Sequence, residues 1–270
     1  MGIGVVNMTK LNVALTIAGT DPTGGAGIMA DLKSFQARGT YGMAVVTSVV
    51  AQNTTGVQKI CNLDLDIIEE QLKSVFSDIV PDAQKTGMLA TREVITLVAN
   101  YIDKNIPYVL DPVMVATSGD KLIDEQARTS LKEVLIPKAT IITPNLPEAE
   151  ELLGKKITTE EDIQNAGKTI LSEYGCKSVL IKGGHLEENL AIDYLFTKDE
   201  VFSWQAKKIK TNHTHGTGCT LSAVICAELA KGKTLQSSVA TAKKFITVAI
   251  EQAPYLGRGN GPVNHTAYKD

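Results

Sequence analysis

The stretch LNVALTIAGTDPTGGAGIMADLKSFQARG, residues 11–39, joins a strand pattern, a glycine-rich turn and a helix pattern. Residues 11–19 are mostly apolar and predict a buried strand, and residues 27–39 predict a helix that ends at glycine. The turn lies between strand and helix as a dinucleotide fingerprint would, but it lacks the G-x-G-x-x-G spacing. The stretch therefore predicts one βα unit, whose glycine-rich turn is either structural or close to a ligand.

The same alternation of strand and helix patterns continues along nearly the whole chain. Short apolar strands are predicted at residues 42–53, 83–89, 107–114, 139–145 and 178–184. Helices are predicted at residues 66–76, 91–104, 124–134, 159–174, 217–231 and 235–253, the first opened by a capping box of Asp66 and Glu69. Strand-like runs at 191–197 and 200–209 predict a hairpin at one edge. The pattern predicts an α/β fold, with a mostly parallel sheet covered by helices on both faces.

Composition and charge indicate how many domains to expect and which classes of partner to exclude. We find no repeat or linker, so we expect a flexible leader at residues 1–10 and a single domain at 11–270. The net charge of −3 gives no basic footprint for nucleic acid or acidic lipid. No apolar run approaches the ~20 residues that span a membrane. The four scattered cysteines fit reduced thiols. We therefore expect a cytoplasmic protein with no nucleic-acid partner and no membrane partner.

Glycine and polar residues gather where the predicted parallel strands end. They are residues 19–27, Gln52, Asn53, residues 85–88, Asp111, residues 143–145 and residues 182–184. Ligands of open α/β sheets bind beyond the carboxyl ends of the strands, so these residues should converge on one edge.

Charged residues at this edge suit a phosphorylated ligand. Asp111 ends an apolar strand, where a carboxylate usually serves a ligand or a metal, and Lys182 suits a nucleotide phosphate. Glu148 follows Asn145 at a helix start. This pair is equally typical of helix capping and of a carboxylate that orders Mg²⁺.

A second glycine-rich turn, THGTGC at residues 214–219, precedes an apolar helix. The N-terminus of a helix presents unpaired N–H groups and favours anions. Two GKT triplets, at 167–169 and 232–234, lack the upstream glycine of a P-loop. His213 and His215 are better explained as loop residues than as a metal pair, because other ligand types are not near them in the sequence. The combination favours Mg²⁺-dependent phosphoryl transfer without a Walker motif.

Several long motifs give the chain a family resemblance. The sequence resembles the ribokinase-like superfamily, and within it the hydroxymethylpyrimidine/phosphomethylpyrimidine kinases of thiamine biosynthesis. The matching stretches are ALTIAGTDPTGGAGIMADLKSF, GMAVVTSVVAQNTTGV, KTGML, VLDPVMVATSGD, ITPNLPEAEELL, IKGGH and THGTGCTLSA. The resemblance implies a three-layer sandwich and a homodimer. It also implies transfer of the ATP γ-phosphate to 4-amino-5-hydroxymethyl-2-methylpyrimidine, and then a second transfer to its monophosphate.

The resemblance also assigns roles to single residues. It implies an anion hole at Gly216, Thr217 and Gly218, with Cys219 as the catalytic base. Because the thiol lies at a helix N-terminus, we expect a lowered pKa. The implied contacts are Lys182, Gly183, Thr217 and Gly218 for ATP, Asp111 and Glu148 for Mg²⁺, and Gln52, Ala18, Gly19, Asp21, Met88 and Val113 for the substrate. The loop at 115–121 is predicted to close over the phosphates.

The residues support three other functions less well than this one. Related pyridoxal kinases typically carry a second cysteine in the loop after D-P-V-M and lack the glutamine, whereas this chain has Ala116 and Gln52. These differences favour the pyrimidine kinase and leave pyridoxal or pyridoxine kinase as the alternative activity. A cysteine hydrolase using Cys219 and His215 lacks an evident base–orienter pair. A non-catalytic nucleotide-binding regulator would not need an intact Asp111, Lys182 and Cys219.

Overall fold

The computed structural model describes residues 11–114, 123–183 and 189–269. Within these residues nine strands form one sheet in the order β3-β2-β1-β4-β5-β6-β7-β8-β9. The strands are β1 (Val13–Gly19), β2 (Tyr41–Asn53), β3 (Gly56–Asn62), β4 (Ala83–Thr86), β5 (Tyr108–Leu110), β6 (Ile141–Ile142), β7 (Ser178–Lys182), β8 (Leu190–Thr197) and β9 (Val201–Lys207). The predicted leader and the predicted loop at 115–121 lie outside the described residues.

Parallel pairing dominates the middle of the sheet. Strand β1 pairs in parallel with β2 and β4, and the parallel order continues through β5 and β6 to β7. The predicted hairpin is confirmed, because β8 and β9 pair antiparallel at one edge of the sheet. The carboxyl ends of the parallel strands therefore face one side of the molecule, as the sequence predicted.

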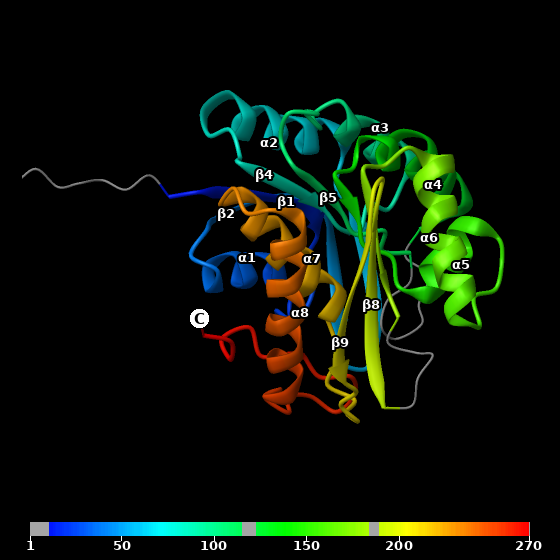
Figure 1. Ribbon diagram of the computed structural model, residues 1–270. Helices are drawn as coiled ribbons and strands as arrows, with labels where there is room; N and C mark the ends of the chain where they lie inside the picture. The colour runs from blue at the N-terminus through cyan, green and yellow to red at the C-terminus, as the bar shows by residue number, and fades with distance from the viewer. Residues whose placement is uncertain (1–10, 115–122, 184–188, 270) are drawn as a thin grey trace, which may run out of the picture.

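Helices cover both faces of this sheet (Figure 1). One face carries α1 (Gly27–Ala37), α7 (Thr217–Ala230) and α8 (Leu235–Glu251). The other carries α2 (Leu65–Asp78), α3 (Arg92–Ala99), α4 (Glu125–Ser130), α5 (Leu146–Leu153) and α6 (Glu160–Tyr174). The α4 helix continues through a π-helical turn at Leu131–Leu135 and a 3₁₀ turn at Ile136–Lys138. This arrangement confirms the three-layer α/β sandwich.

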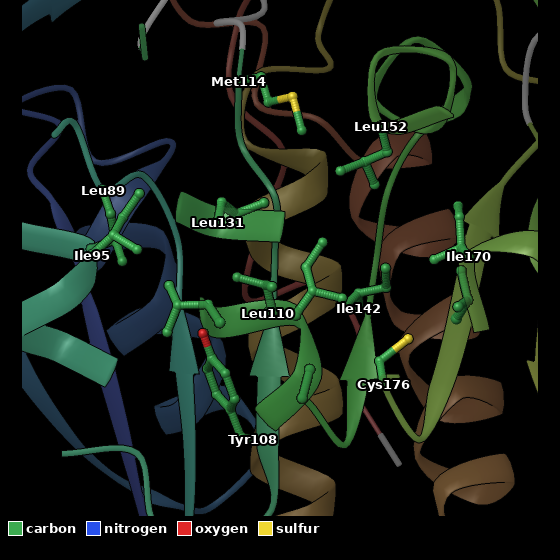
Figure 2. Close-up of a cluster of buried hydrophobic side chains, with 14 of the residues drawn as sticks. Leu89, Ile95, Tyr108, Leu110, Met114, Leu131, Ile142, Leu152, Ile170 and Cys176 are labelled. Carbon is green, nitrogen blue, oxygen red and sulfur yellow. The ribbon is translucent and has the colours of Figure 1, made fainter. Parts of the chain in front are cut away.

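The two faces of the sheet hold separate apolar cores because side chains alternate along each strand. In β5, Tyr108 and Leu110 belong to the core under α2–α6, whereas Val109 belongs to the core under α1, α7 and α8. Figure 2 shows the first of these cores, with Leu110 and Ile142 of neighbouring strands packed below Leu131 and Leu152. Both faces of the central strands are covered, so β1, β5 and β6 are largely apolar, and this made them easy to recognise in the sequence, whereas β4 carries the buried polar residues Gln84, Lys85 and Thr86.

The region after β2 holds one strand that was not predicted and lacks one capping box that was. The structure places an additional strand, β3, antiparallel to β2 at the sheet edge. Its sequence GVQKICN is half polar because the strand is largely exposed, so it lacks the apolar pattern of the central strands. The predicted capping box of Asp66 and Glu69 is absent from the described residues. Helix α2 begins at Leu65 with Asp64 at its N-cap, and Asp66 lies in its first turn.

Real capping boxes occur at the starts of α5 and α6. The Asn145 side chain accepts a hydrogen bond from the backbone N–H of Glu148, and the Glu148 carboxylate accepts one from the N–H of Asn145. Thr159 and Asp162 exchange the same bonds at α6.

None of the helices in the described residues is long and apolar enough to cross a bilayer.

Candidate active site

A cavity of about 720 Å³ opens at the carboxyl edge of the parallel strands. Most of the residues predicted for the site line it: Ala18, Gly19, Gln52, Met88, Asp111, Val113, Glu148, Lys182, Gly216, Thr217, Gly218 and Cys219. They come from strand ends and from the first turns of α5 and α7, so the fold brings together residues that are far apart in the sequence. Asp21 and Gly183 are not among the described residues that line it.

Three charged side chains form the centre of the cavity. The Nζ atom of Lys182 lies 3.6 Å from Oδ1 of Asp111 and 4.0 Å from Oε2 of Glu148. Burial alone would lower the pKa of Lys182, but the charges of Asp111 and Glu148 outweigh burial and raise it. The lysine is therefore a fixed positive charge at neutral pH, between two carboxylates that also face the cavity.

Buried hydroxyl groups orient the Asp111 carboxylate. Thr143 Oγ1 donates to Oδ1 at 3.3 Å, and Ser222 Oγ of α7 donates to Oδ2 at 3.1 Å. Asp111 is only 1% exposed, yet it lines the cavity. A carboxylate held in this way is preorganised for a cation or a charged ligand.

Glu148 fits both of the explanations that its sequence left open. It caps α5 with Asn145, and it also faces Lys182 across the cavity. Burial, reinforced by the neighbouring charge of Asp111 and opposed by Lys182, raises the pKa of Glu148 to about 7. A bound cation would stabilise its ionised form.

The first turn of α7 completes this end of the cavity. Gly216 has φ +77° and packs so tightly that a Cβ atom there would overlap the carbonyl oxygen of Gly25. A Cβ at Gly218 would lie 3.3 Å from Nζ of Lys182. Glycine is therefore required at 216 by both conformation and space, and the N-terminus of α7 lies beside the charged centre.

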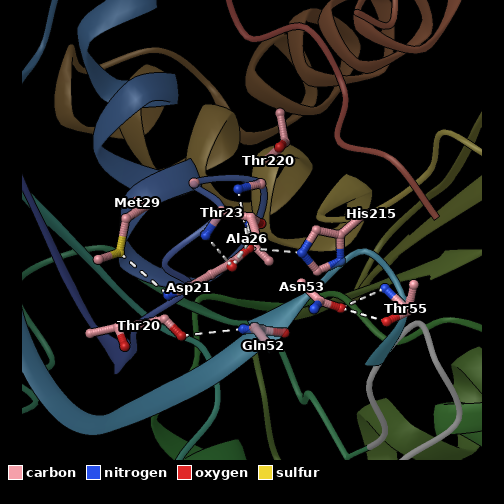
Figure 3. A network of polar contacts seen from close by, with 12 residues as sticks. Thr20, Asp21, Thr23, Ala26, Met29, Gln52, Asn53, Thr55, His215 and Thr220 are labelled. Carbon is pink, nitrogen blue, oxygen red and sulfur yellow. Dashed lines mark hydrogen bonds and ion pairs between the residues drawn. The ribbon is translucent and has the colours of Figure 1, made fainter. Parts of the chain in front are cut away.

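Asp21 holds the first glycine-rich turn in place (Figure 3). Its Oδ1 atom accepts hydrogen bonds from the N–H and hydroxyl of Thr23, and Oδ2 accepts from the N–H groups of Gly25 and Ala26. His215 Nε2 lies 2.7 Å from the same Oδ2 and joins this turn to the start of α7. Burial opposes ionisation, but the hydrogen bonds from His215 and Thr23 lower the pKa of Asp21. Direct substrate contact by Asp21 stays a prediction, whereas the structure shows it organising the turn.

Gln52 lies at the end of the cavity nearest that turn. Its Nε2 donates to the carbonyl oxygen of Thr20 at 3.3 Å, as Figure 3 shows. The backbone N–H of Val50 donates to the Thr20 hydroxyl, so the turn and the end of β2 hold each other. This contact leaves the Oε1 acceptor and one N–H donor of the amide for a ligand.

The comparisons with known proteins agree with this geometry. A family model described as phosphomethylpyrimidine kinase matches residues 21–264. A hydroxymethylpyrimidine/phosphomethylpyrimidine kinase of Staphylococcus aureus strain MRSA252 is 56% identical over 264 residues, which cover 97% of this chain and 96% of that relative. The chain belongs to the phosphomethylpyrimidine kinase family.

Solved structures place this phosphomethylpyrimidine kinase family member in the expected fold. A Clostridium difficile phosphomethylpyrimidine kinase is 44% identical, with a TM-score of 0.79 over 88% of this chain and 99% of that one. A Bacillus subtilis pyridoxal kinase, solved as an ADP complex, is 40% identical, with a TM-score of 0.88 over 96% of this chain and 98% of that one. The ribokinase-like fold is thereby confirmed.

The expected lowering of the Cys219 pKa is not what the structure of this family member shows. Cys219 is half-buried in the first turn of α7 and lines the cavity. Burial raises the pKa of its thiol to about 12, and Asp31 and Asp111 add to the rise, against the opposing charge of Lys85. The sequence showed the helix N-terminus but gave no measure of burial or of the carboxylates that the fold gathers around the sulfur.

Two ion pairs at the site of this family member were not predicted, although Lys85 was among the strand-end residues expected at this edge. Lys85 and Asp31 form a buried ion pair under the first turn of α7. Asp193 and Lys243, which also line the cavity, form another, with Lys243 Nζ 2.8 Å from Asp193 Oδ2, and Asp193 pairs with Lys182 across β7 and β8. A lysine within an apolar strand, as in AQKTGML, is a signal that could have drawn attention to Lys85, because a buried lysine needs a partner.

Metal binding by this family member would depend on few protein ligands. No group of three or more His, Cys, Asp or Glu side chains with metal-binding geometry occurs in the parts of the chain that the structure describes. The two carboxylates of Asp111 and Glu148 offer the hard oxygen atoms that Mg²⁺ prefers. Mg²⁺ commonly completes its shell with water and substrate phosphates, so the residues present fit such an ion.

Proposed function

We propose that this chain transfers the γ-phosphate of ATP to the hydroxymethyl group of 4-amino-5-hydroxymethyl-2-methylpyrimidine. We propose a second transfer to the resulting monophosphate, which gives the diphosphate. The observation that carries the proposal is a single cavity that joins two chemically different ends: charged groups and the α7 N-terminus at one, and the Gln52 amide with apolar walls at the other. Membership of the phosphomethylpyrimidine kinase family supports it.

The charged end provides for the phosphates. Lys182 would balance the negative charge of the transferred phosphoryl group, and the N–H groups at Gly216–Cys219 would donate to its oxygen atoms. Asp111 and Glu148 would hold Mg²⁺, which would supply positive charge to neutralise the charge that develops on the phosphates. Because these groups are held before a ligand arrives, little reorganisation is required during transfer.

The other end of the cavity suits a flat polar ring. Ala18, Gly19, Met88 and Val113 provide apolar walls, and Gln52 presents the remaining hydrogen-bonding capacity of its amide. A donor and an acceptor side by side complement the edge of an aminopyrimidine. The hydroxymethyl group of a ring bound there would point towards the charged end.

ADP release from the purified protein, with MgATP and a panel of acceptors, tests this proposal. We expect turnover with the hydroxymethylpyrimidine and with its monophosphate, and formation of the diphosphate detected by mass spectrometry. Pyridoxal and pyridoxine complete the panel, because the Bacillus subtilis pyridoxal kinase is similar over nearly the whole chain. ADP release with the B6 compounds alone would replace the proposed function by that second candidate.

Replacing Gln52 by methionine should change the choice of acceptor. A polar group that loses its buried partner costs about 1–3 kcal/mol, which corresponds to a roughly 5–150-fold loss of kcat/KM for the pyrimidine. We expect a much smaller loss for any pyridoxal phosphorylation.

The matched control for Gln52→Met is Asn53→Ala at the next position of β2. Asn53 Oδ1 accepts only from Thr55 of the adjacent turn among the contacts of the described residues, so this variant should keep the ratio of the two activities. Equal losses on both acceptors in Gln52→Met would show that Gln52 holds the loop and does not select the substrate.

We also propose that the protein is a cytoplasmic homodimer, as expected for a member of this family. Analytical ultracentrifugation of the purified chain measures the assembly directly. A monomer at micromolar concentration would contradict the dimer.

A further inference from the structure

A completely buried ion pair lies directly under the first turn of α7. Nζ of Lys85, on β4, is 2.7 Å from Oδ1 of Asp31, on α1, and both side chains are 0% exposed. Burying two charges is costly, and an apolar pair of similar volume is often as stable or more stable. The position of this pair therefore calls for an explanation beyond stability.

Lys85 is connected to Cys219 by geometry. Its Nζ lies 3.5 Å from the Cys219 carbonyl oxygen, which also accepts a hydrogen bond from the Ser222 hydroxyl. Asp31 itself lines the cavity, as Cys219 does. The ammonium group therefore contacts the backbone of a cysteine that lines the cavity.

Asp31 fixes the position of the lysine. Its second oxygen, Oδ2, accepts a hydrogen bond of 2.6 Å from the Thr16 hydroxyl on β1. The carboxylate is thus held between two strands and α1, and Lys85 cannot move away from α7 without losing its buried partner. Burial favours the neutral form of both groups, yet the charge of Asp31 outweighs burial and raises the pKa of Lys85, which stays protonated.

We propose that Lys85 is a positioning residue for Cys219: it holds the first turn of α7 and supplies the positive charge that stabilises the Cys219 thiolate. In this arrangement Asp31 orients Lys85 and weakens its effect on the sulfur. An effect of Lys85 on kcat rests on the proposed role of Cys219 as a base. An effect of Lys85 on the reactivity of the thiol does not.

The charges around Cys219 determine in which direction each substitution should change the pKa of its thiol. Lys85 and Lys182 are the cations that interact with this thiol, and Asp31 and Asp111 are the carboxylates that oppose its ionisation. Lys182 and Asp111 approach from the strand ends, whereas the buried pair lies beneath the helix. Removing Lys85 should make the thiol less acidic, and neutralising Asp31 should make it more acidic.

The rate of alkylation of Cys219 by iodoacetamide, followed from pH 6 to 10, measures this acidity without any substrate. The experiment uses a Cys61→Ser background because Cys61 is exposed, and a peptide mass assay separates Cys219 from the buried Cys176 and Cys226. The variants are Lys85→Met, Lys85→Arg, Asp31→Asn and the double variant Lys85→Met with Asp31→Leu. Melting curves and circular dichroism establish that each one is folded.

Lys85→Met should lower the alkylation rate at pH 8 about tenfold, corresponding to about one pKa unit. Lys85→Arg should restore most of the rate, and Asp31→Asn should increase it several-fold above the parent protein. The double variant removes both charges without leaving either one unpaired, so it should fold and still react more slowly than Asp31→Asn.

A role confined to stability predicts a different pattern. Loss of either partner would then disturb α7 in the same way. Lys85→Met and Asp31→Asn would therefore change the rate of Cys219 alkylation in the same direction. That result, or unchanged rates in the folded double variant and in Lys85→Met, would overturn the proposal. Opposite changes would support it even if the acceptor panel refuted the proposed kinase activity.

Discussion

Asp111→Ala is expected to lower kcat by about 10²–10³-fold while the protein stays folded, because a preorganised charge at the reacting phosphate contributes an effect of this size. The carboxylate lies 3.6 Å from Lys182 and is oriented by Thr143 and Ser222. Its removal would take away one of the two carboxylates proposed to hold Mg²⁺ and one of the negative charges that act on Lys182.

Turnover at saturating ATP across a range of Mg²⁺ concentrations measures this effect. Ser222→Ala is the matched control, because it removes one hydrogen bond to Asp111 and keeps the carboxylate. We expect it to lose only about 10–100-fold, as is usual for residues that orient a metal ligand. Undiminished turnover of Asp111→Ala, or of the parent protein in excess chelator, would contradict the assignment of Asp111 to Mg²⁺.

The central sheet could be predicted from sequence because its strands are covered on both faces. Residues such as Val109 and Leu110 point into different cores, so both must be apolar, and a continuous apolar run results. The edge strand β3 has one exposed face and mixed residues, so its sequence does not distinguish it from a loop. The ends of the helices were least reliable, since Asp64 and Asp66 are equally suitable capping residues in sequence.

The location of the site could be predicted from the sequence, whereas the charges that surround each of its residues could not. Strand ends of a parallel sheet must share an edge, and this rule brought Asp111, Lys182 and Gln52 into one cavity. The rule does not say which side chains turn inward under a helix. Lys85 and Asp31 are 54 positions apart in sequence, and only the packing of α1 on β1, the strand beside β4, makes them partners. The pKa of Cys219 depends on that packing. The helix N-terminus alone predicted a lowered pKa, and this prediction was wrong.

Cys219→Ala is expected to reduce kcat by about 10²–10⁴-fold and to leave ATP binding intact, if the thiolate accepts the proton of the substrate hydroxymethyl group. The thiol lies in the first turn of α7, beside the N–H groups that would stabilise the transferred phosphate. The proposed ATP contacts include other groups, such as Lys182, so calorimetric titration with a non-hydrolysable ATP analogue should give a similar dissociation constant.

Two further substitutions at Cys219 separate a base from a residue that only packs. Serine keeps the size and a hydrogen bond but is a far weaker acid than a thiol, so Cys219→Ser should be nearly as slow as Cys219→Ala. Aspartate provides an ionised base, so Cys219→Asp should retain part of the activity. A fully active serine or alanine variant would refute the base role and leave the α7 N-terminus as the catalytic element of this segment.

The pH dependence of a single turnover follows from the acidity of the group at position 219. Burial raises the Cys219 pKa to about 12, so the thiolate fraction, and with it the transfer rate, should increase with pH across pH 6–9. The same burial would also raise the pKa of an aspartate at this position, but from a much lower starting value, so the rate of Cys219→Asp should level off at a lower pH than that of the parent protein. Rapid-quench measurements detect the transfer step itself and avoid interference from slow product release. Parallel profiles for the two proteins would mean that the proton passes directly to the phosphate, because the rate would then be independent of which base stands at position 219.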